Sequence, residues 1–143
     1  LHADPNYANA WMWRGNTKSY LGDAEGAIED LQQALRLNPL DLTLWIAHTG
    51  MANAHFLRGR YEEALSWVSM ALRQRPNSLS VLRVAIAAHA LAGNLDMARQ
   101  LSGRYRELDP DARLAKMREW WWFRRDEDVE KYLKGFRLAG MPE

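Results

Sequence analysis

The sequence predicts an all-α protein in which three helical hairpins stack in series as a solenoid, followed by a C-terminal helical cap. The main observation is a recurring unit of glycine, amphipathic segment and proline, found at 22–39, 59–76 and 93–110. In each copy an alanine follows the glycine after five residues, and the proline follows that alanine after twelve. Successive copies lie 37 and 34 residues apart, a period typical of helical repeat arrays.

The composition excludes several classes of protein. The 143 residues suffice for one domain, and the net charge of +1 provides no strong field for nucleic acid or an anionic membrane. No apolar run approaches the roughly 20 residues that cross a bilayer. The absence of cysteine excludes disulfides and thiol catalysis and fits a reducing, cytoplasmic compartment. Because residues 1–5 repeat the end of a unit without an initiator methionine, we expect a piece of a longer protein.

The first unit, about 8–41, is predicted to contain helices over 7–21 and 24–37. Apolar residues on both segments follow the i, i+3, i+4 spacing of an amphipathic helix. Gly15 in the middle of the first helix indicates a close approach of the neighbouring helix. Asp23 is expected to cap the second helix, and Pro39 to end the unit.

The second and third units are expected at about 42–78 and 79–112. Their helices are predicted at 43–58, 61–74, 78–92 and 95–108. Because the second unit is three residues longer than the third, we place a longer loop or an extra helical turn at 40–44.

The repeat pattern fades after Pro110, where residues 113–143 are expected to form a helical cap. Asp111 is predicted to cap a short helix to about 119, and Asp126 to cap a last helix to about 138. Part of the aromatic run at 120–123 is expected to cover the helix at 95–108. Any part of that run left exposed would offer a contact for a homodimer.

The residues of the three units resemble the tetratricopeptide repeat over about 1–112. The resemblance rests on Trp11 and Gly15 in the first unit and on the alanine and the closing proline of each unit, which are Ala27, Ala64, Ala98, Pro39, Pro76 and Pro110. It implies antiparallel helix pairs in a right-handed superhelix, with the first helix of each pair lining a concave groove. It also implies a non-catalytic module that binds peptides or proteins.

The predicted partner-binding groove consists of Trp13, Asn16, Tyr20, Asn53, Phe56 and Arg83. Asn16 and Asn53 occupy equivalent positions, and an amide can both donate to and accept from a peptide backbone. An asparagine tolerated on an open helix face fits the pattern equally well. The resemblance places a carboxylate-binding clamp at positions that here hold Met12, Gly50, Ser80 and Val84. The groove is therefore expected to suit an apolar peptide or an amphipathic helix.

The sequence contains no pattern for a cofactor or a reaction. His48, His55 and His89 are interpreted as packing residues and not as metal ligands, and no phosphate loop or nucleophile elbow occurs. The leading hypothesis is a non-catalytic interaction scaffold, and the alternative is a self-association module of a regulator.

Residues 123–143 also resemble the C-terminal ending of bacterial signalling proteins that join a class III nucleotide cyclase or a winged-helix domain to tetratricopeptide repeats. This second resemblance implies that the whole protein serves bacterial signalling. It concerns the longer protein, because no cyclase residues occur in this chain.

Overall fold

The computed structural model describes residues 5–40, 42–119 and 123–143. These residues form eight helices and no strand, as the sequence predicts. The helices are α1 (Pro5–Tyr20), α2 (Ala24–Leu37), α3 (Leu44–Leu57), α4 (Tyr61–Gln74), α5 (Leu79–Leu91), α6 (Leu95–Leu108), α7 (Leu114–Glu119) and α8 (Asp126–Leu138).

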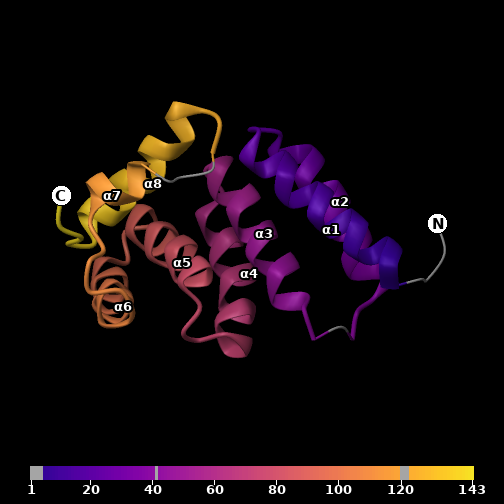
Figure 1. Ribbon diagram of the computed structural model, residues 1–143, viewed down its shortest axis with the longest axis horizontal. Helices are drawn as coiled ribbons and strands as arrows, with labels where there is room; N and C mark the ends of the chain where they lie inside the picture. Colours follow the sequence, from indigo (N-terminus) through magenta and orange to yellow (C-terminus); the bar gives the residue numbers. More distant parts are fainter. Residues whose placement is uncertain (1–4, 41, 120–122) are drawn as a thin grey trace.

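The first six helices pair as three antiparallel hairpins, α1 with α2, α3 with α4, and α5 with α6. The hairpins follow one another across Figure 1, because α2 packs on α3 and α4 packs on α5. The first helices of the hairpins also contact one another, α1 with α3 and α3 with α5. The solenoid is therefore confirmed, and α1, α3 and α5 line one face of it.

Glycine sets the turn inside each hairpin. Gly22, Gly59 and Gly93 have φ of +92°, +75° and +90°, a left-handed conformation that glycine adopts without strain. After each glycine a backbone N–H donates to the carbonyl five residues earlier, as Asp23 does to Lys18 at 2.8 Å. This bond closes a helix with a Schellman motif. The Asp23 side chain accepts from the Gly26 N–H at 3.0 Å, which confirms the predicted cap of α2.

Small residues let the helices of the first hairpin approach closely. A Cβ at Gly15 would lie 2.7 Å from Leu31 Cγ and 3.1 Å from the Ala27 carbonyl oxygen. Leu31 and Ala27 are fully buried, so neither side of the contact has room for a methyl group. The close approach predicted from Gly15 is confirmed.

The C-terminal part differs in detail from the expectation. Helix α7 begins at Leu114, so Asp111 is too far from its start to cap it. Asp126 is the first residue of α8, and Arg125 occupies the N-cap position in its place. Helix α8 packs on α5 and α7. Residues 120–122 lie outside the described part, and Phe123 lies against Tyr20 of α1 and Tyr132 of α8.

Of the three additional residues of the second unit, two lengthen the loop between α2 and α3 relative to the loop between α4 and α5, and one lengthens α3 relative to α5. Leu40 and Leu42 in this loop are 91% and 87% exposed. In the part of the chain that the structure describes, no helix combines the length and the apolar character needed to cross a bilayer.

Candidate partner-binding pocket

A pocket of about 410 Å³ lies where α1, α3 and α5 meet the C-terminal segment. Its described lining residues are Trp13, Asn16, Thr17, Tyr20, Trp45, Ile46, Thr49, Gly50, Asn53, Ser80, Arg83, Phe123 and Tyr132. Five of the six residues that the sequence predicts for the groove are among them, and Phe56 is not. The volume falls within the range of about 300–1,000 Å³ that is usual for ligand sites.

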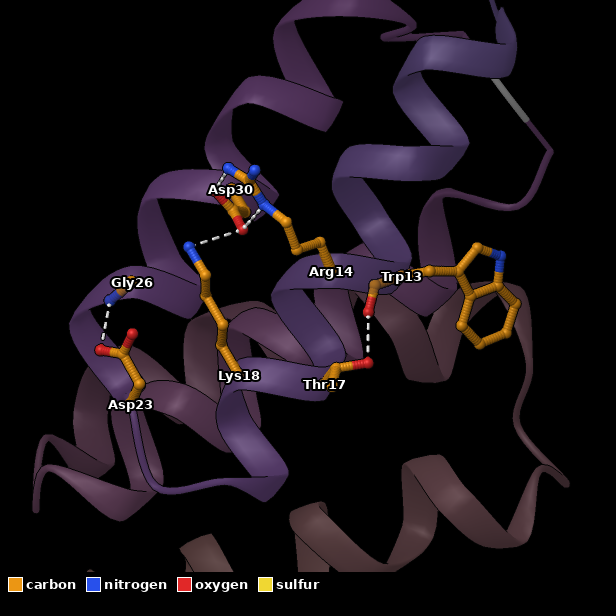
Figure 2. A network of polar contacts seen from close by, with 7 residues as sticks. All are labelled: Trp13, Arg14, Thr17, Lys18, Asp23, Gly26 and Asp30. Carbon is orange, nitrogen blue, oxygen red and sulfur yellow. Dashed lines mark hydrogen bonds and ion pairs between the residues drawn. The ribbon is translucent and has the colours of Figure 1, made fainter.

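Helical spacing places the lining residues of each helix on one side. On α1 the residues Trp13, Asn16 and Tyr20 follow the i, i+3, i+7 pattern. Figure 2 shows the Trp13 indole pointing away from α2, and 60% of this residue is exposed. Asn16 reaches toward α3, where Gly50 leaves room for it, since a Cβ at Gly50 would lie 2.3 Å from Asn16 Oδ1.

The structure does not place Phe56 in the pocket as predicted, because its side chain is fully buried. Its ring centroid lies 4.3 Å from that of Tyr132 and 5.6 Å from that of Tyr61. Helix α8 therefore covers the groove position that the repeat pattern assigns to Phe56.

Phe123 and Tyr132 line the pocket although the repeat pattern did not indicate them. The Tyr132 hydroxyl donates to Asn53 Oδ1, and burial raises the pKa of this tyrosine well above its usual value. Tyr132 and Phe136 lie one turn apart on α8 and are both fully buried. That spacing indicates an apolar stripe on α8, but it does not indicate the surface on which the stripe packs.

The pocket is polar on one side. The Arg83 Nε–H donates to the Tyr105 hydroxyl at 3.0 Å, and the guanidinium lies 5.8 Å from the centroid of that ring. Burial raises the pKa of Tyr105 and of Tyr20. Among the described lining residues, Arg83 is the only one with a formal charge at neutral pH, and none is a carboxylate, histidine or cysteine. These side chains can hold a ligand by hydrogen bonds and ring contacts, but they provide no general base.

His48, His55 and His89 lie outside this pocket. The centroid of the His48 ring is 5.7 Å from that of Trp67, and His89 Nδ1 is 3.3 Å from Nδ2 of the Asn94 side chain. Burial lowers the pKa of His48, His55 and His89. The described residues contain no group of three or more histidine or acidic side chains placed to hold a metal ion.

A charged network occupies another face of the first hairpin (Figure 2). Arg14 donates to both Asp30 oxygens at 2.7 Å, and Lys18 Nζ lies 3.0 Å from Oδ2. The Asp30 side chain is only 3% exposed. The Arg14 hydrogen bonds, together with Lys18, hold the pKa of Asp30 below its usual value. The network fixes α1 to α2 and so holds the pocket-lining face of α1 in place.

Comparison with known sequences identifies the repeats. The tetratricopeptide repeat family model matches residues 20–84, which confirms tetratricopeptide repeats in this chain. The CTR9 homolog of Arabidopsis thaliana is 29% identical over 109 residues, covering 76% of this chain and 10% of that protein. The human Superkiller complex protein 3 is 32% identical over 99 residues, covering 68% of this chain and 5% of that protein. The chain thus spans a tenth or less of the length of these relatives.

Solved structures show the same fold. The first tetratricopeptide repeat domain of Spaghetti (RPAP3), bound to the HSP90 peptide SRMEEVD, has a TM-score of 0.69 at 19% identity and covers 97% of both chains. The second such domain of human RPAP3, in complex with the HSP70 peptide SGPTIEEVD, has a TM-score of 0.67 at 18% identity and covers 94% of this chain and 98% of that chain. These similarities support the helical solenoid along nearly the whole chain.

Proposed function

We propose that this chain is a non-catalytic module that binds a peptide segment of a partner protein in the pocket between α1, α3 and α5. The observation that carries the proposal is the convergence of Asn16 and Asn53, from equivalent positions of successive repeats, on one pocket with aromatic walls. Amides supply hydrogen bonds to a main chain, and rings supply apolar contact.

The two asparagines have different parts in this proposal. Asn53 Oδ1 accepts from Tyr132, so its amide NH₂ is the group that meets a peptide carbonyl. Asn16 lies next to Gly50, and it offers both a donor and an acceptor to an extended backbone. A segment held at both asparagines would run past Trp13, whose exposed indole would cover it.

The partner segment is proposed to be apolar and not an acidic tail. The peptides in the two solved relatives, SRMEEVD and SGPTIEEVD, are acidic. In this chain the positions of the expected clamp are Met12, Gly50, Ser80 and Val84, which carry no charge, and Met12 and Val84 are buried. Among the described lining residues, Arg83 is the one that could neutralise such a peptide.

The test is selection of peptides from a random display library, followed by affinity measurement on variants. Asn16→Ala is expected to weaken the selected peptides at least tenfold, which corresponds to about 1.4 kcal/mol. Gln32→Ala is the matched control, because it removes an exposed amide from α2 outside the pocket. Selected peptides that bind Asn16→Ala as tightly as the unchanged chain would refute the proposal.

We further propose, on the resemblance of residues 123–143 alone, that the module serves a larger bacterial signalling protein. Self-association is the alternative function, with the N-terminal edge of the repeats or an exposed part of the aromatic run as the predicted contact. Light scattering across a concentration series measures self-association directly, since a dimer doubles the mass of 16.5 kDa.

A further inference from the structure

We propose that the C-terminal segment closes one end of the groove, so that the partner inserts a single neutral aromatic side chain and does not lay a long helix across the repeats. This inference rests on the proposed function and specifies the kind of partner. Phe123 and Tyr132 form this closed end, although neither belongs to a repeat.

A continuous row of rings crosses the groove from α1 to α3. The Phe123 centroid lies 5.1 Å from Tyr20 and 5.2 Å from Tyr132, and Tyr132 lies 4.3 Å from Phe56. Tyr20 ends α1, and Phe56 is in the last turn of α3. The row therefore forms a wall at the carboxyl ends of both helices. The Arg124 N–H donates to the Tyr20 carbonyl at 2.8 Å, which ties the wall to the first repeat.

Helix α8 is fixed beside this wall. Gly135 packs so closely on Ala87 of α5 that a Cβ would lie 2.8 Å from Ala87 Cα. Lys131 Nζ donates to the Leu57 carbonyl at 3.2 Å, and Leu133 is fully buried. Ala87 is the third-repeat equivalent of Asn16 and Asn53. The third repeat therefore presents a small residue to α8 where the other two present an amide to the pocket.

The wall limits how a partner can lie in the groove. The pocket has a volume of about 410 Å³, which is enough for one large side chain. A helix that ran along the groove past the carboxyl ends of α1 and α3 would meet the wall of Phe123 and Tyr132.

The chemistry of the lining residues favours a neutral ring. Trp13, Tyr20, Trp45 and Phe123 offer ring faces and edges, which attract another aromatic ring in offset or edge-to-face geometry. No described lining residue is a carboxylate, and the charge of Arg83 opposes a cationic side chain. The anchor is therefore a phenylalanine, tyrosine or tryptophan side chain.

The experiment uses blocked amino acids as probes, with NMR of the whole ¹⁵N-labelled chain. N-acetyl-tryptophanamide and N-acetyl-phenylalaninamide at millimolar concentration are expected to shift the Asn16 amide and Trp13 indole signals saturably, whereas N-acetyl-lysinamide does not. Ser80→Phe fills the pocket and should abolish the shifts. Ser69→Phe, on the exposed face of α4, should leave them unchanged. Absence of saturable shifts with the aromatic probes would overturn the inference.

A second measurement separates this inference from the proposed function. Peptides from the display selection are shortened around their aromatic residue, and about four residues are expected to retain affinity within fivefold. If the selected peptides instead need a helix of 12 or more residues but are weakened by Asn16→Ala, the inference fails and the proposed function stands. If Asn16→Ala has no effect on any of them, the proposed function fails.

Discussion

The docking of α8 depends on the missing side chain of Gly135. An alanine there would place its Cβ 2.8 Å from Ala87 Cα, 3.1 Å from Ala87 Cβ and 3.2 Å from the Ala87 carbonyl oxygen. Two of these three atoms belong to the backbone of α5, which cannot rotate away as a flexible side chain could. Gly135→Ala must therefore push α8 away from α5.

The expected cost follows from two opposing effects. Replacing glycine by alanine inside a helix stabilises it by about 1 kcal/mol. Overpacking a buried contact costs about 1–3 kcal/mol, and a clash with backbone belongs at the upper end of that range. We therefore expect a net loss of about 1–2 kcal/mol, which lowers the melting temperature by roughly 3–6 °C in a domain of this size.

Thermal unfolding followed by circular dichroism at 222 nm measures this difference. Gly103→Ala is the matched control, because Gly103 lies inside α6 and a Cβ there would face open space, with no neighbouring atom of the described residues within 4 Å. That change should stabilise the chain by up to about 1 kcal/mol through helix propensity alone. If Gly135→Ala proves as stable as Gly103→Ala, α8 does not pack on α5 as described, and the closed pocket end loses its support.

Three further substitutions test the fold. Gly93→Ala should lower the free energy of unfolding, measured in urea, by about 1 kcal/mol. The cause is the φ of +90° alone, since no described atom lies within 4 Å of the place of its Cβ. A variant as stable as the unchanged chain would refute the left-handed turn. Asp30→Asn should lower the free energy of unfolding by about 1–2 kcal/mol at pH 7. Because folding lowers the pKa of Asp30, its stabilising effect is complete above the unfolded pKa of about 3.9 and is lost as the pH falls through the folded pKa. The difference in unfolding free energy between Asp30→Asn and the unchanged chain, measured in urea, should therefore be smaller at pH 3 than at pH 7. Burial lowers the pKa of His55, so the folded state favours its neutral ring. The resulting stabilisation is complete above about pH 6.5, the unfolded pKa, and is lost as the pH falls below it. His55→Gln should therefore show a shallower fall in melting temperature between pH 7 and pH 5, and an unchanged slope would contradict this reasoning.

The hairpins could be predicted because their signals are local. Gly22 and its equivalents serve a turn that closes within six residues, and each proline stops the helix before it. Gly15 and Leu31 lie in neighbouring helices of one hairpin, so periodicity alone brings them together. The same periodicity placed five groove residues on one face, and the structure gathers them around one pocket.

The closed end of the pocket could not be predicted, because it depends on contacts between distant residues. Tyr132 bonds to Asn53 across 79 positions of the chain, and Gly135 meets Ala87 across 48. An apolar stripe on α8 is compatible with packing on any exposed apolar surface of the last repeat. The small residue at position 87, where the earlier repeats have asparagine, is the one signal that could have indicated the third repeat's groove face as that surface.

The face of the first hairpin that carries Arg14 shows that equivalent positions need not have equivalent roles. Arg14 corresponds in register to Met51 and Ala85, which are buried between hairpins, and Asp30 corresponds to Leu101 of the third repeat. Covering this face with an apolar hairpin from a second copy would strip water from Arg14, whose side chain is 57% exposed, and from Lys18. Removing charges from water costs several kcal/mol unless new partners replace it. Self-association through the first hairpin therefore requires a charged partner surface, and an apolar dimer contact has to use another part of the chain.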